Sequence, residues 1–252
     1  MTLEEILEAA ENGDISAINA VGDVYSRDMH ISDAAMWYGR SAALGDQYGR
    51  VMALMSHQLW ASVGEGTGVY DDALDNWQMA YKYLTDILND VNSLDEHTRT
   101  AKESYSGVVL GIGASLYFLK RKEESFKYLE IAAEQGEIMA EVMLGLYFQS
   151  TFTAETGYEY TKRSIPLLEK VFSPDFAYSD SSHMEQMIVF LAYRYLAETY
   201  RRGLGGLKPD TARSYNCMLC LHEQNLKNYT DEVRKELGKY KKGLLGGYKY
   251  IG

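Results

Sequence analysis

Small, apolar and polar positions follow a helical period along the chain, and glycines divide this pattern into units. A small-residue pair closed by glycine recurs three times, in the segments 9–13 (AAENG), 41–45 (SAALG) and 132–136 (AAEQG). A glycine after such a run favours the left-handed backbone that ends a helix. The pattern therefore predicts helix ends at Gly13, Gly45 and Gly136.

The residues that follow each of these glycines also recur, at the same three offsets. They place two small or apolar residues and one ring along a single helix face. In chain order the three sets are Ala17, Gly22 and Tyr25; Gly49, Leu54 and His57; and Ala140, Gly145 and Phe148. Because small residues let a second helix approach closely, this stripe predicts tightly packed helix pairs.

A second pattern marks the partner helix of each pair. It is an aspartate followed five residues later by an aromatic residue, in the pairs Asp33 and Tyr38, Asp72 and Trp77, and Asp210 and Tyr215. An aspartate can cap a helix by accepting a backbone N–H hydrogen bond, so each is expected at a helix N-terminus. Glycine-rich segments at 64–68 and 203–206 are expected to connect the helices.

The resulting unit of two helices and a glycine turn resembles SEL-one-like repeats, which are relatives of the tetratricopeptide repeat. The resemblance is carried by the segment 66–72 (GTGVYDD), by Trp37-Tyr38 followed by Ser41-Ala42, and by the segment 132–136. It implies an all-α superhelix, or solenoid, of about five helix pairs. Two departures interrupt the repeat: long helices are expected at 47–60 and 72–90, and Ile165-Pro166 falls at an expected helix start, followed by a loop at 172–182.

The same resemblance implies that the first helix of each unit lines a concave face. Aligning the units through Gly22, Leu54, Gly145 and Ala197 gives the inward polar, charged or aromatic positions as candidate partner-binding residues. These are Asn19, Asp23, Arg27, Tyr48, Met55, Gln58, Gln149, Arg194, Glu198, Arg201 and Arg202.

Residues 238–252 differ from the rest of the chain. They hold five glycines and four lysines but no acidic residue, which is too glycine-rich for a stable helix. Two interpretations remain open: a frayed terminus, or a binding element that folds onto the acidic first half of the same or a neighbouring molecule. The expected organisation is one helical repeat domain at 1–237 and a tail at 238–252.

Charge and composition restrict the partner. The net charge is −11, and residues 1–100 carry 17 acidic and 5 basic side chains, which disfavours binding to nucleic acid.

No apolar run is long enough for a membrane span, and the acidic start is unlike a secretory signal, so a cytoplasmic protein is expected. Only three prolines occur, which suits long helices.

Several motifs that suggest chemistry are better explained by packing. Cys217 and Cys220 have the spacing of a redox or metal pair, but they follow the Asp210 cap and are expected in a helix core. Gly107, Gly111 and Gly113 lack the strand that precedes a dinucleotide loop. The five histidines are scattered, the acidic cluster at 71–75 lacks the spacing of a calcium loop, and the basic run at 120–122 is expected in a solvated loop. No metal or cofactor is expected.

The sequence therefore favours a non-catalytic scaffold or adaptor that binds another protein or an extended peptide by reversible docking. Two alternatives stay open. One is an inhibitor or immunity-type protein that blocks a toxin or enzyme, and the other is an enzyme whose site forms between repeats. The oligomeric state is left open.

Overall fold

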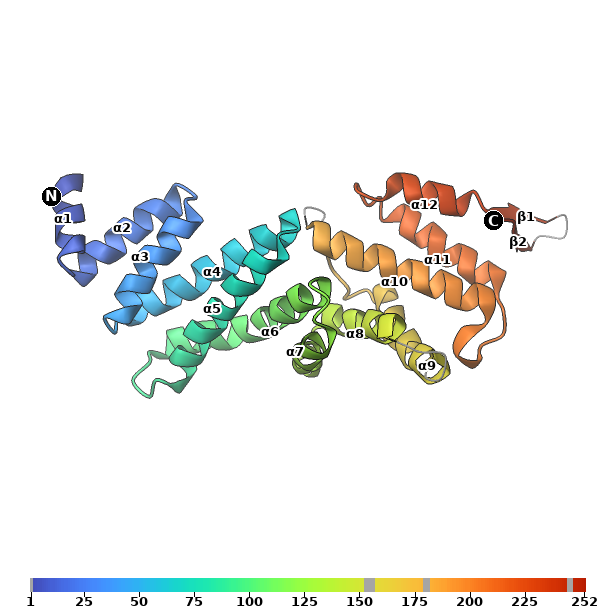
Figure 1. Cartoon of the computed structure of the whole chain (residues 1–252), viewed down its shortest axis with the longest axis horizontal. Helices are drawn as coiled ribbons and strands as arrows, with labels where there is room; N and C mark the ends of the chain where they lie inside the picture. Colours follow the sequence, from blue (N-terminus) through green and yellow to red (C-terminus); the bar gives the residue numbers. More distant parts are fainter. Residues whose placement is uncertain (1, 152–156, 179–181, 244–246) are drawn as a thin grey trace. The chain divides into compact units, whose positions relative to one another are not determined.

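The computed structural model describes residues 2–151, 157–178, 182–243 and 247–252, and this part of the chain is almost entirely helical (Figure 1). The expected all-α class is confirmed. The chain divides into two compact units, Met1–Ile131 and Ala132–Gly252, which are described separately. Helix α7 (Lys122–Glu134) runs across the boundary between them in sequence. None of the described helices is both long and apolar enough to cross a membrane.

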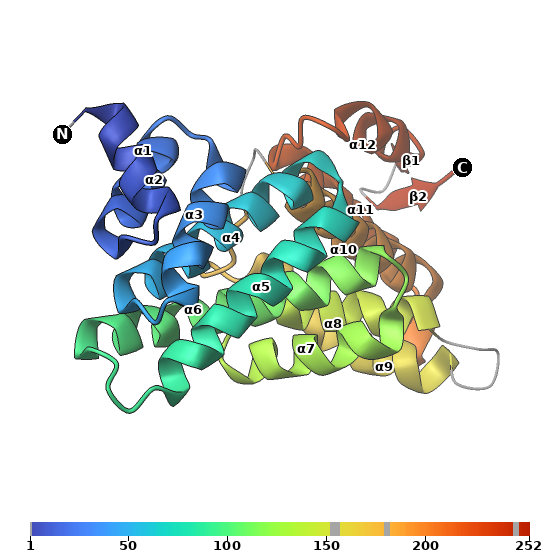
Figure 2. The same ribbon diagram turned by 60° about the vertical axis from the view of Figure 1, so that its left-hand side comes forward.

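In unit 1, helices that are consecutive in sequence pack against one another, and Figure 2 shows α3, α4 and α5 side by side. The helices are α1 (Leu3–Glu11), α2 (Ile15–Arg27), α3 (Ile31–Ala43), α4 (Gln47–Thr67), α5 (Tyr70–Asn89) and α6 (Asp95–Phe118). Their core is built from large side chains that are almost fully buried, among them Tyr38, Leu54, Leu84 and Ile112. Burial of such side chains supplies most of the driving force for packing the helices.

In unit 2, α10 packs against α11 and α8 packs against α9. The elements are α8 (Ile138–Thr151), α9 (Gly157–Leu168), the 3-10 turn η1 (Glu169–Phe172), α10 (His183–Arg202), η2 (Leu204–Gly206), α11 (Thr211–Glu223) and α12 (Thr230–Leu237), followed by strands β1 (Tyr240–Lys242) and β2 (Tyr248–Tyr250). The two strands pair antiparallel, with Tyr240 opposite Tyr250. The core includes Ile188, Tyr193 and Leu221.

The glycine pattern correctly predicted the helix ends. Gly13, Gly45 and Gly136 have φ values of 89, 88 and 91°, a left-handed conformation that suits glycine. The expected close approach is also present, because a Cβ placed on Gly22 would lie 2.7 Å from the Tyr38 ring and one on Gly145 would lie 2.8 Å from Leu168. The stripe of small residues therefore marks helix contacts.

Two of the three expected aspartate caps were wrong. Asp210 caps α11 by accepting from the backbone N–H of Arg213, at 2.8 Å. Helices α3 and α5, however, begin two residues before Asp33 and Asp72, which therefore lie in the first turn, where they still favour the helix dipole. Asp14 and Asp46, each directly after a turn glycine, are aspartate caps that the pattern did not predict.

The connection expected at 64–68 was also wrong, because α4 continues to Thr67. Gly64 is needed where α5 approaches, since a Cβ there would lie 3.1 Å from Ala73. The next residue, Glu65, is buried, and its Oε1 accepts hydrogen bonds from Trp77 at 2.8 Å and from Ser115 at 3.3 Å. This carboxylate links α4, α5 and α6, so the segment is helical core and only Gly68 and Val69 form the turn.

Pro166 does not start a helix as expected, since it lies in the last turn of α9. The missing N–H removes one hydrogen bond near the helix end, and the chain tightens directly afterwards into η1. The loop expected at 172–182 does separate η1 from α10, although its residues 179–181 lie outside the described part of the chain.

Candidate functional site

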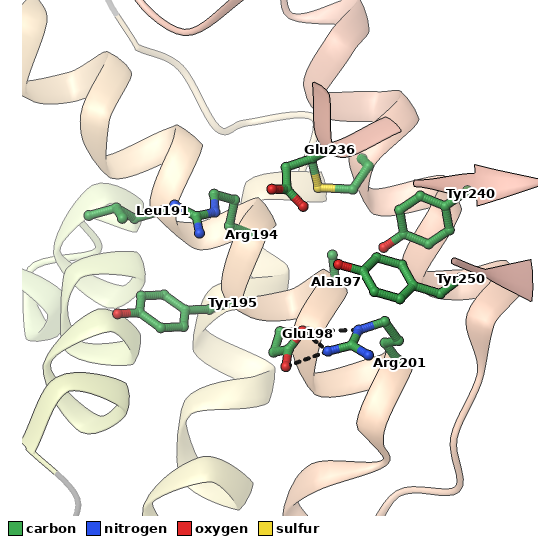
Figure 3. A pocket seen from close by; sticks show the side chains of 10 residues that line it. Leu191, Arg194, Tyr195, Ala197, Glu198, Arg201, Glu236, Tyr240 and Tyr250 are labelled. Atoms are coloured by element: carbon green, nitrogen blue, oxygen red, sulfur yellow. Dashed lines mark hydrogen bonds and ion pairs between the residues drawn. The ribbon is translucent and has the colours of Figure 1, made fainter. Parts of the chain in front are cut away.

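Helix α10 carries four of the predicted binding residues, and three of them line a cavity of about 190 Å³ in unit 2 (Figure 3). Arg194, Glu198 and Arg201 are spaced four and three residues apart, so they project from one face of the helix. The other lining residues are Leu191, Tyr195 and Ala197 of α10, Met218 of α11, Glu236 of α12, Tyr240 of β1 and Tyr250 of β2. We call this cavity the α10 pocket.

A bidentate ion pair fixes one wall of the α10 pocket. The Arg201 guanidinium donates to both Glu198 carboxylate oxygens, through Nη2 at 2.6 and 2.7 Å (Figure 3). Arg202 adds a contact to Glu198 at 3.3 Å. Burial, the largest single influence, would raise the pKa of Glu198, but the hydrogen bonds and charges of Arg201 and Arg202 together outweigh it and lower that pKa. Glu198 is therefore held as a carboxylate whose charge is already satisfied.

The C-terminal hairpin supplies an adjoining wall. The Tyr250 ring lies 4.3 Å from the Arg201 guanidinium carbon, a cation–π contact, and the Tyr215 and Tyr248 rings stack with centroids 3.8 Å apart. Ser214 Oγ donates its only proton to the Ala197 carbonyl at 2.6 Å. The Tyr240 hydroxyl lies 2.7 Å from Ser214 Oγ. Because Ser214 has no second proton to donate, the Tyr240 hydroxyl is the donor and Ser214 Oγ the acceptor.

Residues 238–252 thus contain an ordered hairpin that docks on α10 and α11 of its own unit, which neither interpretation of the sequence anticipated. The described part of the segment pairs in register and packs three tyrosine rings onto the helices. The sequence does contain a pattern that could have predicted these strands. Tyrosine and lysine alternate at Tyr248-Lys249-Tyr250, next to a glycine-rich segment, and a two-residue period is typical of a β-strand.

In unit 1, the predicted polar residues are engaged with the fold itself. Asn19 donates to Asp46 Oδ2 at 2.9 Å, and Asp23 Oδ1 accepts from the hydroxyls of Tyr38 at 2.7 Å and Tyr48 at 2.9 Å. Burial, followed by the bond to Asp23, raises the pKa of Tyr38 far above its usual value. We call these five side chains the α2–α4 network.

An apolar stripe on α4 lies beside this network. Met55 was predicted, but Leu59 and Val63 were missed, although they follow at helical spacing. Together with Tyr48 these side chains are exposed by 41–49%. Of the remaining predicted residues, Arg27 is exposed and Gln58 is half-buried.

The prediction that Gln149 lies on an open, partner-binding face is wrong. Its side chain is buried, and its Nε2 donates to Ser164 Oγ at 2.5 Å, which ties α8 to α9. The alignment through Gly145 predicted an open position for Gln149, but α9 covers it.

The pair Cys217 and Cys220 lies in α11, as expected, with Cys217 in the core. Burial raises the pKa of Cys217 to about 12 and also raises that of Cys220. Such thiols are protonated at neutral pH, whereas a reactive or metal-binding cysteine needs the thiolate. Within the described residues, no group of three or more histidine, cysteine or acidic side chains is arranged to hold a metal ion.

The three glycines that lack a preceding strand all lie in α6, and their surroundings differ. Gly111 and Gly113 lie where Trp77 and Leu129 approach α6, as close packing requires, whereas a Cβ on Gly107 would meet no atom within 4 Å. In the basic run, Lys120 and Arg121 lie in the turn between α6 and α7, with Lys120 at a φ of 65°, and Lys122 begins α7. Neither a protein-family model nor a curated protein sequence matches this chain.

Proposed function

We propose that the protein is a non-catalytic binding module, a solenoid of stacked helix pairs, that docks another protein through the α10 pocket. One observation carries the proposal: Arg194, Glu198 and Arg201, which the sequence predicts as binding residues, line a single cavity together with three tyrosine rings. Aromatic and arginine side chains around an apolar centre are typical of residues that dominate binding energy at protein interfaces.

The size of the cavity favours a partner's side chain over a complete small molecule. Sites for drug-sized ligands and cofactors enclose about 300–1,000 Å³. The α10 pocket, at about 190 Å³, is below that range and is open on one side. A volume of this order suits one large side chain of a protein or peptide, anchored while the rest of the partner lies across α10 and the hairpin.

The charged groups of the pocket favour binding over catalysis. A general acid or base works best with a pKa near the working pH and a proton that is free to move. Glu198 is held ionised by arginine, and Glu236 accepts from Lys239 Nζ at 2.6 Å. Both carboxylates therefore act as fixed partners of cations.

The apolar stripe on α4 supports the same class of function independently. Tyr48, Met55, Leu59 and Val63 occupy one helix face at the spacing by which helices and grooves bind apolar anchors. Contiguous exposed apolar side chains of this kind are common at protein interaction sites. We propose the stripe as a second contact surface of the module.

The experiment is a selection of displayed random peptides on the purified full-length protein. We expect enriched peptides that lose binding at least tenfold to Leu191→Trp, which fills the α10 pocket. The matched control is Leu219→Trp, a half-buried leucine of α11 that does not line the pocket, and binding to it should be unchanged. Peptides that bind the two variants equally, or a selection with no enriched peptide, would refute docking at this pocket.

A partner captured from cells that make the protein then separates the scaffold from the inhibitor. The captured protein should show the same sensitivity to Leu191→Trp. If it is a single enzyme or toxin whose activity falls on binding, the inhibitor alternative gains support.

A further inference from the structure

The charges around the α10 pocket are unequal. Among the residues that the structure describes, four cations lie in or directly beside it, together with two carboxylates, Glu198 and Glu236. The cations are Arg194, Arg201, Arg202 and Lys239. Each carboxylate is already paired, Glu198 with two arginines and Glu236 with Lys239. The pocket therefore has an excess of positive charge in a chain whose net charge is −11.

Arg194 carries the part of this excess that is available to a ligand. Among the described residues it makes no ion pair. Its guanidinium carbon lies 5.2 Å from the centre of the Phe190 ring, which is a cation–π contact. A ring contact of this kind orients a guanidinium but leaves its N–H groups free to donate. Figure 3 shows Arg194 beside Leu191 at one end of the pocket, away from the Glu198–Arg201 pair.

The rest of the wall is apolar. Leu191, Ala197 and Met218 line the cavity together with the rings of Tyr195, Tyr240 and Tyr250. The arrangement is a cavity with an apolar part, with carboxylates that are already paired, and with one open guanidinium at its end. An arginine in this position can bind a carboxylate through two parallel N–H donors.

Resting on the proposed function, we propose that the α10 pocket binds an acidic peptide segment: a large apolar side chain enters the cavity, and a neighbouring aspartate or glutamate side chain pairs with Arg194. Capture of a chain-terminal carboxylate usually relies on free backbone N–H groups. The α10 residues that line the pocket lie at 191–201, inside a helix that spans His183–Arg202, where backbone N–H groups are already bonded. An acidic side chain within the segment is therefore the carboxylate that fits.

The hairpin adds to this preference. Lys241 and Lys249 are exposed on the two strands, opposite each other in the register, and no acidic residue lies within 238–252. Exposed cations next to a binding site increase the association rate of anionic partners, and the increase falls with salt. The preference for acidic peptides should therefore weaken as the ionic strength rises.

The test uses three fluorescent ten-residue peptides and the full-length protein. Each peptide has a central leucine, followed by two glutamates, two glutamines or two lysines, and all have amidated C-termini. Fluorescence anisotropy should show binding in the order glutamate, glutamine, lysine, with at least a tenfold difference between the first and last. A glutamate peptide with a free C-terminus should bind equally well.

Arg194→Gln should remove most of the glutamate preference, while the glutamine peptide binds both proteins alike. The matched control is Arg163→Gln, since Arg163 is also exposed and lies 4.2 Å over a phenylalanine ring, Phe148, but outside the pocket. It should leave all three peptides unaffected.

The possible failures are distinguishable. In one case the leucine peptides bind and Leu191→Trp abolishes binding, but the glutamate, glutamine and lysine peptides bind equally or Arg194→Gln has no effect. The specificity for acidic peptides is then refuted, and the proposed docking function stands. If binding ignores Leu191→Trp, both are refuted. A strong preference for the free C-terminus would overturn the assignment of the carboxylate to a side chain.

Discussion

The α2–α4 network of unit 1 and the α10 pocket of unit 2 use similar residues for different purposes. Both are built around polar side chains that the repeat resemblance predicts to be partner-binding residues, on α2 in unit 1 and on α10 in unit 2. In unit 1, Asp23 and Asn19 bond to Tyr38 and Asp46 of the next helices. In unit 2, the described residues form no ion pair with Arg194, which lies over the Phe190 ring, whereas the hairpin residue Tyr250 contacts Arg201.

The difference shows that helix position alone does not make a binding residue. A polar side chain on the inner face stabilises the fold when the following helix offers a partner close by. It becomes available to a ligand when the neighbouring element supplies mainly rings and apolar surface. The positions predicted from the resemblance therefore include residues that bond within the fold and residues that we propose for binding, and substitutions can separate the two groups.

The largest effect on stability is expected from removing the carboxylate of the α2–α4 network. Asp23→Ala deprives the fully buried Tyr38 hydroxyl of its carboxylate acceptor. Loss of a partner for a buried polar group costs about 1–3 kcal/mol. The matched substitution in the pocket, Glu198→Ala, breaks a partly exposed ion pair and should cost less than about 1 kcal/mol.

Urea unfolding of the two variants measures these free energies, and peptide binding gives the second readout. Asp23→Ala should leave pocket binding unchanged in the folded protein, whereas Glu198→Ala should alter it. Equal destabilisation by both substitutions would show that the contrast between network and pocket is false.

An intermediate effect is expected at the hairpin. Tyr240→Phe removes the hydrogen bond that the Tyr240 hydroxyl donates to Ser214 and leaves the ring in place. A hydrogen bond of this type contributes about 0.5–1.5 kcal/mol. We expect faster amide hydrogen exchange at β1 and β2, with little change in α10, because the loss is local. Unchanged exchange in the strands would mean that the hydroxyl does not hold this wall of the pocket.

The sequence was sufficient for the helical class and for the closest helix contacts, because these depend on local rules. The glycines at 13, 45 and 136 end helices, and Gly22 and Gly145 mark where another helix lies against the backbone. Both follow from the size and backbone freedom of glycine, which no distant residue changes.

Burial of polar groups was beyond the same reasoning. Gln149 was expected on an open face, but Ser164 of α9 covers it, and Glu65 was expected in a loop, but it bonds to Trp77 inside the core. The pocket itself needed Tyr240 and Tyr250, which lie about 40 to 60 residues from Arg194 along the chain. Such contacts between distant residues are set by tertiary packing, which a local pattern does not encode.

The smallest effect is expected from the pH dependence of Asp46, the other acid of the α2–α4 network. Burial would raise its pKa, but hydrogen bonds from Asn19, Gly49 and Ser41 outweigh burial and lower the pKa below the usual 3.8. A carboxyl whose pKa is lower in the folded state stabilises the fold above its unfolded pKa. That contribution is lost as the pH falls through the folded value.

Asp46→Asn tests this, because asparagine is an equally good helix cap but carries no charge. The difference in unfolding free energy between wild type and variant should be present at pH 7, shrink below the usual pKa of 3.8 and disappear at lower pH. Asn19→Ala, made with Asp46 in place, removes one hydrogen-bond donor to the carboxylate. It should therefore reduce the pH-dependent contribution of Asp46 to the free energy of unfolding. A difference that stays constant from pH 7 to pH 2.5 would show that the substitution acts through the shape of the cap, and that the ionised carboxylate adds nothing to the network.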